Sequence, residues 1–189
     1  STIGVLEHAI KNVDKWTKDE KRPSNVDRPF FIRMLMGFLG SKSYIKYQPL
    51  GTVGVISPWN FPVNLILAPL GGIFAAGNRA MIKPSELTPA TSEVTKKMFE
   101  AYFDKSEAAV FTGDAEVGAA FSALPFDHLL FTGGTQIGKK VMKAASDNLV
   151  PVTLELGGKS PVIVDENADL SEVAKKVMRG KTMNAGQIC

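Results

Sequence analysis

Residues 51–83 read GTVGVISPWNFPVNLILAPLGGIFAAGNRAMIK, and this stretch decides the fold. An apolar strand at 53–56 leads into a turn with two prolines, and an apolar helix follows over 65–76. Gly77 and Asn78 end that helix, and a second apolar strand covers 80–83. A strand, a buried helix and another strand in this order predict a βαβ unit, in which a right-handed crossover joins two parallel strands.

The same alternation continues along the chain. Thr88 and Pro89 are typical of the start of a helix, and Val94, Met98 and Tyr102 predict its apolar face. Together with the elements that follow, this pattern predicts a Rossmann-like α/β fold, a parallel sheet with helices on both faces. The further elements are strands at 108–112, 128–131 and 152–156 and helices at 116–123 and 135–145.

The first fifty residues are less regular. The charged stretch 18–29 contains prolines and predicts a linker, and the apolar run 30–39 predicts either a buried strand or a short helix. Residues 44–47 are β-prone, and an exposed apolar strand of this kind favours a subunit contact over a ligand site. Residues 3–17 predict a helix whose apolar face contains Leu6, Ile10, Val13 and Trp16.

The last thirty residues predict one more strand, at 161–165, and a helix at 170–180. Asp169, followed three residues later by Glu172, is typical of the start of such a helix. The chain begins with Ser1 and ends on Cys189, a residue type that does chemistry, with no element after it. We therefore expect these 189 residues to be an incomplete portion of a protein.

Composition excludes several classes of protein. The 22 Lys and Arg residues against 19 Asp and Glu residues give a net charge of +3 that is spread along the chain, so we expect no nucleic-acid partner. The longest apolar run, 29–39, is too short for a membrane span, and we see no signal peptide. One cysteine forms no internal disulfide, which favours a cytoplasmic location. The two histidines lack metal-ligand spacing with that cysteine, so we expect no metal site.

Residues after the predicted strands could bind a ligand, because the carboxyl ends of parallel strands meet at one edge of a sheet. The glycine-rich turn 132–135 opens a helix and could approach a phosphate closely, although a tight turn alone would explain it. Lys83 ends a strand and could bind phosphate or ribose hydroxyls, or could be a solvated lysine. Asn60 lies between two prolines, where its amide would be held; turn formation is the alternative.

Two further residues could act in catalysis. Glu155 is flanked by leucines, and burial there would raise its pKa towards that of a general base. Cys189 follows a small, glycine-containing approach, which a nucleophile needs if backbone N–H groups are to point at the carbonyl that it attacks. The other interpretation of a lone cysteine is a small buried apolar residue.

Together, five motifs resemble the aldehyde dehydrogenase superfamily, and more closely its class 3 branch, which includes fatty-aldehyde and coniferyl-aldehyde dehydrogenases. In this order and spacing they are highly specific, and the resemblance covers about 48–189. It is looser upstream. The motifs read PWNFP at 58–62, KPSE at 83–86, FTGGT at 131–135, ELGGKSP at 155–161 and NAGQIC at 184–189.

The resemblance implies that Cys189 attacks an aldehyde, that Asn60 and the Cys189 backbone N–H hold the oxyanion, and that Glu155 activates the water that hydrolyses the thioester. It implies NAD or NADP as cofactor, with Lys83 and Glu86 on the adenosine ribose. Glu86 would mildly disfavour a 2′-phosphate by like-charge repulsion. Near the pyrophosphate the resemblance implies Trp59, Gly133 and Gly134, with Ser57 as a further cofactor-binding residue. The family usually has Ser where Gly134 stands.

The family's layout implies three parts and a homodimer. Residues 1–29 and 50–157 would form the dinucleotide-binding domain, 30–49 an oligomerisation hairpin, and 158–189 the start of a second α/β domain, the catalytic one. A second cofactor-binding glutamate and most of that domain would lie beyond residue 189, so we expect the isolated portion to be inactive. The alternatives are a CoA-acylating or acyl-phosphate-reducing relative, against which Glu155 argues, and a non-catalytic nucleotide-binding fragment.

Overall fold

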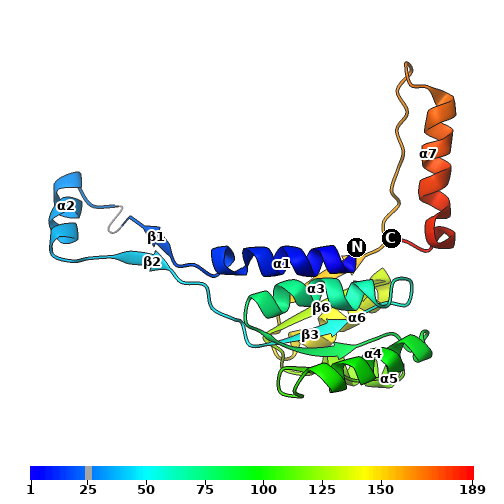
Figure 1. Cartoon of the computed structure of the whole chain (residues 1–189), viewed down its shortest axis with the longest axis horizontal. Helices are drawn as coiled ribbons and strands as arrows, with labels where there is room; N and C mark the ends of the chain where they lie inside the picture. The colour runs from blue at the N-terminus through cyan, green and yellow to red at the C-terminus, as the bar shows by residue number, and fades with distance from the viewer. Residues whose placement is uncertain (24–26) are drawn as a thin grey trace.

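A parallel sheet forms the centre of the molecule. The computed structural model describes residues 1–23 and 27–189. Within them, five parallel strands lie in the order β5-β4-β3-β6-β7 (Figure 1). This order confirms the expected Rossmann-like fold, since the chain moves outward from β3 on one side and then returns to its other side. The strands are β3 (Thr52–Ile56), β4 (Arg79–Lys83), β5 (Ala108–Val110), β6 (His128–Gly133) and β7 (Val152–Leu156).

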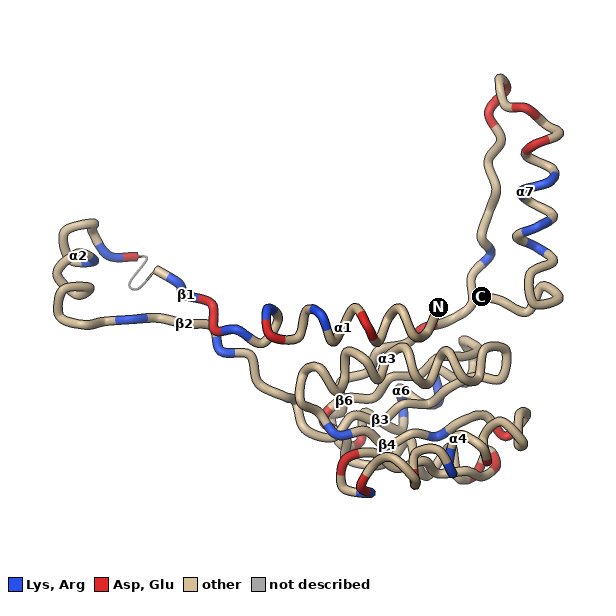
Figure 2. Tube along the Cα trace, viewed as in Figure 1, with Lys and Arg blue, Asp and Glu red and all other residues tan. Residues whose placement is uncertain are grey.

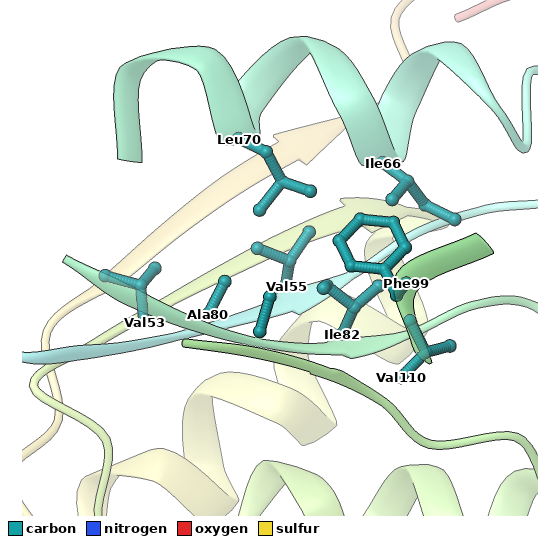
Figure 3. Close-up of a cluster of buried hydrophobic side chains, with 9 residues drawn as sticks. Val53, Val55, Ile66, Leu70, Ala80, Ile82, Phe99 and Val110 are labelled. Carbon is teal, nitrogen blue, oxygen red and sulfur yellow. The ribbon is translucent and has the colours of Figure 1, made fainter. Parts of the chain in front are cut away.

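Helices cover both faces of this sheet. On one face, α3 (Asn64–Ala75) and α4 (Pro89–Tyr102) bury Ile66, Leu70 and Phe99 against β3, β4 and β5. Figure 3 shows Ile66 and Leu70 of α3 above the sheet. On the other face, α5 (Ala115–Ser122) and α6 (Thr135–Ser146) pack around a second cluster. That cluster contains Phe121, Phe126, Leu129, Phe131, Val141, Ala145 and Val150.

The predicted apolar face of α4 is only partly right: Met98 packs against the cluster that contains Ile66 and Leu70, but the other two predicted residues do not. Val94 and Tyr102 are exposed, and the helix buries Ser92, Thr95 and Phe99 instead. The two buried hydroxyls are satisfied locally: Ser92 Oγ donates to the Ser85 carbonyl oxygen at 2.9 Å, and Thr95 Oγ1 donates to the carbonyl oxygen one turn earlier. A hydroxyl that finds such a partner is buried at little cost, which allows two polar residues on this face.

Helix α1 (Thr2–Trp16) lies along the outer side of α3 (Figure 1). Its contact surface is narrower than the predicted apolar face, because Ile10 and Trp16 are exposed and Ala9 is the residue that is buried. A Cβ at Gly71 of α3 would come within 3.1 Å of the Leu6 side chain, so the glycine permits the close approach.

A first arm, defined as residues 18–23 and 27–47, projects from the sheet (Figure 1). It contains β1 (Glu20–Arg22), α2 (Phe30–Phe38) and β2 (Ser43–Ile45), and β1 pairs with β2 in antiparallel fashion. The linker prediction for 18–29 is therefore wrong at 20–22, and residues 24–26 lie outside the described part of the chain. The apolar run is a helix that buries none of its residues. None of the helices in the described residues has the length and apolar character needed to cross a bilayer.

A second arm, residues 158–182, leads away from β7 (Figure 1), and Figure 2 shows that it carries both acidic and basic residues. It contains α7 (Leu170–Thr182), where Asp169 Oδ1 accepts hydrogen bonds from the Ser171 and Glu172 N–H groups, as predicted. The predicted strand at 161–165 is wrong: the segment has no ladder partner among the described residues, and Ile163 is 94% exposed. Apolar alternation alone does not make a strand, because its backbone groups need a neighbour. A 3₁₀ turn, η1 (Met183–Gly186), follows α7.

Side-chain hydrogen bonds hold the amino end of β3. Asn78 Oδ1, in the turn before β4, accepts from the Leu50 and Gly51 N–H groups at 2.6 and 3.0 Å. Asp127, in the turn before β6, accepts from the Thr52 N–H group at 2.6 Å. These contacts hold β3 to its neighbours β4 and β6 at the edge of the sheet opposite the carboxyl ends.

Candidate functional site

A cavity of about 470 Å³ opens at the carboxyl ends of β3, β4 and β6, between α5 and α6. It lies where the strand order reverses, between β3 and β6, which is the ligand position of open α/β sheets. The residues that the sequence predicted for a cofactor all line it: Ser57, Trp59, Lys83, Glu86, Gly133 and Gly134.

Lys83 and Glu86 form an ion pair in the wall of the cavity. Lys83 Nζ donates to Glu86 Oε2 at 3.0 Å; the lysine side chain is 4% exposed and the glutamate side chain 44% exposed. The pKa of Glu86 lies below its ordinary value, mainly because its carboxylate accepts a hydrogen bond from its own backbone N–H and to a smaller extent because it accepts one from Lys83. Lys83 is thus no solvated surface lysine: its ammonium group is buried at a strand end and compensated by a carboxylate.

Small residues of α5 shape one wall of the cavity. Ala115, Gly118, Ala119 and Ser122 line it, and a Cβ placed at Gly118 would lie 3.8 Å from Lys83 Cε. The Ser122 hydroxyl is turned into its own helix, where it donates to the Gly118 carbonyl oxygen at 2.8 Å. The side facing α6 is therefore smooth and able to hold a flat ring.

The glycine-rich turn brings β6 into the N-terminus of α6. Gly134 is the N-cap residue, and Ile137 in the first turn also lines the cavity. A Cβ at Gly133 would lie 2.6 Å from Cζ of the buried Phe131 ring, so a side chain there is excluded. Nothing lies within 4 Å of the corresponding position at Gly134. The positive end of the α6 dipole at this cavity suits an anionic ligand.

The turn after β3 runs from the cavity to the C-terminal segment, residues 184–189. Trp59 lines the cavity, and the next residue, Asn60, donates from Nδ2 to the Gln187 carbonyl oxygen at 2.9 Å. Asn184 Nδ2 returns a bond to the Asn60 carbonyl oxygen at 2.8 Å. This pair of hydrogen bonds joins residues more than 120 positions apart, so it fixes the end of the chain beside the cavity.

Cys189 lies at the end of this C-terminal segment. Its side chain is exposed, which disfavours the buried apolar interpretation, and its carbonyl oxygen accepts from the Gly158 N–H group at 2.7 Å. A Cβ at Gly157 would come within 3.1 Å of that oxygen. The turn at 60, the end of β7 and the C-terminal residues are thus connected through hydrogen bonds to backbone carbonyl oxygens.

The burial expected for Glu155 is wrong. Glu155 pairs with Thr132 in the ladder between β7 and β6, but its side chain is exposed. The flanking Leu154 and Leu156 pack against the hydrophobic cluster under α5 and α6. Because side chains alternate along a strand, the residue between them points to the opposite face of the sheet. The desolvation on which the expectation rested is therefore missing.

Sequence reasoning missed much of the cavity lining, namely Ser85, Leu87, Ala115, Gly118, Ala119, Ser122, Ile137 and Lys140. The signal that could have found the α5 wall is the spacing of small residues at 115, 118, 119 and 122, one face of a helix. Within the described residues, no three His, Cys, Asp or Glu side chains gather as metal ligands would.

Comparison with known proteins agrees with this geometry. The family described as "Aldehyde dehydrogenase family" matches residues 2–189. The chain is 58% identical to a probable coniferyl aldehyde dehydrogenase of Caulobacter vibrioides, over all of this chain and 37% of that protein.

Two solved structures resemble the chain closely. The substrate-bound state of Staphylococcus aureus AldH matches with a TM-score of 0.89 and 45% identity, over 99% of this chain and 39% of that one. A Mycobacterium tuberculosis aldehyde dehydrogenase complexed with NAD+ matches with a TM-score of 0.84 and 30% identity, over 100% and 36%. The chain thus spans less than two fifths of the length of these relatives.

Proposed function

Because this chain belongs to the aldehyde dehydrogenase family, we propose that it forms part of an enzyme that oxidises aldehydes to carboxylic acids with NAD+ or NADP+. One observation carries the proposal. The turn 57–60 lines the cavity at one end and bonds the segment that carries Cys189 at the other. A nucleophile, an amide donor and a nucleotide-sized cavity then adjoin, as transfer of a hydride from an adduct on the cysteine requires.

The cavity residues fit a dinucleotide. The smooth α5 wall would accept the adenine ring, and the Lys83–Glu86 pair would bind ribose hydroxyls, with the ammonium donating and the carboxylate accepting. Gly133, Gly134 and the N-terminus of α6 would approach the pyrophosphate. Ser57 and Trp59 would line the path towards the cysteine. The cofactor, when bound, supplies the acceptor for the hydride. The NAD+ complex of the M. tuberculosis relative supports this assignment.

Cys189 would act as the nucleophile. Its thiolate attacks the aldehyde carbon to give a thiohemiacetal, and loss of hydride leaves a thioester. An amide has two N–H donors, so Asn60 can keep its bond to the Gln187 carbonyl oxygen and direct the other hydrogen to the oxyanion. The Cys189 backbone N–H would be the second donor, and one such donor is worth about 3 kcal/mol of transition-state stabilisation.

Glu155 would be the general base that activates water for hydrolysis of the thioester. It is the penultimate residue of β7, two residues before Gly157, where an added Cβ would lie 3.1 Å from the Cys189 carbonyl oxygen, which supports a role close to the cysteine. General-base catalysis of this kind contributes about 10²–10⁴-fold. Hydrolysis distinguishes this reaction from the transfer of the acyl group to CoA or phosphate.

The family layout supports a division of the chain into a dinucleotide-binding domain at 1–29 and 50–157, an oligomerisation hairpin at 30–49 and the start of a catalytic domain at 158–189; the pairing of β1 with β2 favours including 20–22 in the hairpin. The exposed apolar helix α2 supports a role of the hairpin in a homodimer, because apolar side chains such as Phe30 and Phe38 are stabilised by a partner surface. We propose a cytoplasmic location from the single cysteine.

The test is Cys189→Ala in the full-length enzyme. We expect aldehyde oxidation to disappear while calorimetric NAD+ binding is retained. Oxidation that survives the substitution would refute the assignment of Cys189. Assays with hexanal, a long-chain aldehyde and coniferyl aldehyde would define the substrate class, for which the Caulobacter relative suggests an aromatic aldehyde.

The products separate the competing readings. An acid formed at the same rate with and without CoA supports hydrolysis, and a product formed only with CoA would indicate a CoA-acylating enzyme. The 189 residues assayed alone, beside the full-length enzyme, test whether this part binds cofactor without oxidising aldehydes.

A further inference from the structure

Two asparagine side chains and two carbonyl oxygens form a closed set of hydrogen bonds near the end of the chain. Asn184 Nδ2 donates to the Asn60 carbonyl oxygen at 2.8 Å and to the Gln187 carbonyl oxygen at 3.2 Å. The Gln187 oxygen also accepts from Asn60 Nδ2 at 2.9 Å. Both lone pairs of the Gln187 oxygen are then occupied, so this carbonyl group has a fixed direction.

The two amide groups differ in the donors that remain. An amide group has two N–H donors. Asn184 directs both of them at carbonyl oxygens, whereas Asn60 directs one at Gln187, and no second acceptor for its amide is found among residues 1–23 and 27–189. Asn184 therefore has no donor left for a ligand, and its amide serves to hold its neighbours. The remaining N–H group of Asn60 is the one that can meet an oxyanion.

The nucleophile has an anchor that does not involve Asn184. The Cys189 carbonyl oxygen accepts from the Gly158 N–H group, just after β7, at 2.7 Å. The backbone of Asn60, by contrast, is bonded to the C-terminal segment through the Asn184 amide. Loss of the Asn184 side chain would therefore leave Cys189 held to the end of β7 but would release the turn that carries Asn60.

The backbone at Asn184 has an unfavourable conformation. Asn184, Ala185 and Gly186 have φ values of 50°, 55° and 77°, so three consecutive residues are left-handed. Glycine adopts this conformation freely and asparagine tolerates it, but alanine is strained there. Strained backbone persists only where surrounding contacts hold it, and it is common at active sites. The two bonds from Asn184 Nδ2 are such contacts, and the Gln187 N–H group adds a third by donating to the Asn184 carbonyl oxygen at 3.0 Å.

We infer that Asn184 is a positioning residue for aldehyde oxidation and that it acts through Asn60. The inference rests on the proposed function and adds a residue to its mechanism. Asn184 does not line the cofactor cavity, and both of its N–H groups are used within the protein. Its bonds keep the second N–H group of Asn60 aimed at the point where the aldehyde oxygen becomes negative. A donor that is aligned beforehand needs no reorganisation when that charge develops.

Ala185 provides a matched control. Asn184→Gly removes both side-chain bonds and leaves the left-handed backbone accessible, because glycine adopts a positive φ without strain. Ala185→Gly adds similar backbone freedom at the next position, where φ is 55°, and keeps the bonds of Asn184. Neither variant introduces a clash or new strain, so both should fold. A difference between them reports the hydrogen bonds and not the flexibility of the turn.

The experiment is a double-mutant cycle in the full-length enzyme, with whichever of the three aldehydes above reacts fastest. Removal of one oxyanion donor predicts that Asn60→Ala lowers kcat/KM by about 10²–10³-fold. Misalignment of the same donor predicts a loss of about tenfold for Asn184→Gly, and less than about twofold for Ala185→Gly. In the Asn60→Ala background, Asn184→Gly should cost less than about twofold, because no donor is left to position. Calorimetric affinity for NAD+ should stay within about twofold in every variant.

Three results would overturn the inference, and they are distinguishable. If the wild-type enzyme oxidises no aldehyde, or Asn60→Ala leaves kcat/KM unchanged, the proposed mechanism fails and the role of Asn184 fails with it. If Asn60→Ala is impaired but Asn184→Gly matches Ala185→Gly, the proposed function stands and Asn184 takes no part in it. If Asn184→Gly costs the same factor with and without the Asn60 amide, Asn184 supports the structure and does not act through Asn60.

Discussion

Replacing Lys83 by methionine should separate ligand binding from stability. The buried ammonium would be lost, while an unbranched apolar stem of similar length would remain against α5, where a Cβ at Gly118 would lie 3.8 Å from Lys83 Cε. The partner, Glu86, keeps 44% of its side chain exposed and stays hydrated after the substitution. The cost of about 3–5 kcal/mol for orphaning a fully buried charge therefore does not apply.

The expected changes in stability and in affinity follow from the different exposure of the two partners, Lys83 and Glu86. An ion pair with one partner near solvent contributes about 0.2–1 kcal/mol, and burial of the methionine stem offsets part of the loss. We expect the free energy of unfolding to change by less than about 1 kcal/mol, a shift in Tm of about 2–4 °C at most for a chain of this size. NAD+ binding should weaken at least about tenfold, because a hydrogen bond from a charged donor contributes about 1.5–3 kcal/mol.

Urea denaturation gives the first quantity and titration calorimetry with NAD+ the second. Lys97→Met is the matched control, since Lys97 also pairs with a glutamate, Glu93, at 3.7 Å, but with 72% of its side chain exposed. It should change neither quantity appreciably. A loss of stability above about 3 kcal/mol for Lys83→Met would refute the structural reasoning, because it would mean that Glu86 is left without water. Unchanged NAD+ affinity would refute the role of Lys83 in the cofactor site.

Three further predictions concern the neighbouring segments. Gly133→Ala should cost about 1–3 kcal/mol of unfolding free energy in urea, because its Cβ would meet the buried Phe131 ring at 2.6 Å; Gly134→Ala, with open space around it, should not, and equal effects would contradict this. Glu86→Gln should lower the free energy of unfolding at neutral pH. Because the pKa of Glu86 is lowered in the folded state, the difference in stability from wild type should begin to shrink below pH 4.5, the ordinary pKa, and should vanish as the pH falls through the lowered pKa. A difference in Tm that persists in acid would argue against this. Asn184→Gly keeps the positive φ of 50° but removes the bond to the Asn60 carbonyl oxygen, so amide hydrogen exchange at 187–189 should accelerate more than in Ala185→Gly, where φ is 55°; equal rates would exclude the bond as the anchor.

The sheet could be predicted from the sequence because its signals are local and strong. Apolar strands of β-branched residues, a glycine stop at Gly77 and Pro89 at the first position of α4 each act within a few residues. The position of the cavity then follows from the strand order, since ligands bind at the carboxyl ends of parallel strands. The motifs supplied the residues that line it, including Lys83 and Gly133.

The errors arose where a residue's surroundings depend on distant parts of the chain. Glu155 has leucine neighbours, but these face α6 while the carboxylate faces the other way, and sequence does not say which face is covered. The buried face of α4 was missed because Ser92 finds its acceptor seven residues away, in the turn after β4. The apolar run at 161–165 lacks a ladder partner in the described residues. Lys140 was missed because nothing in its local pattern distinguishes it from Lys139.

The hydrogen bonds of Asn78 and Asp127 lie at the amino ends of the strands, whereas the cavity lies at their carboxyl ends. β3 is five residues long, so the amino and carboxyl borders of the sheet are separated by about 17 Å. Substitutions that strengthen the amino border while keeping these hydrogen bonds can therefore raise heat tolerance without changing the nucleotide cavity, whereas a proline at position 51 or 127 would remove a bonded N–H group and lower it. The same separation means that substitutions at the carboxyl border can change ligand binding while the hydrogen bonds at the amino border keep the sheet intact.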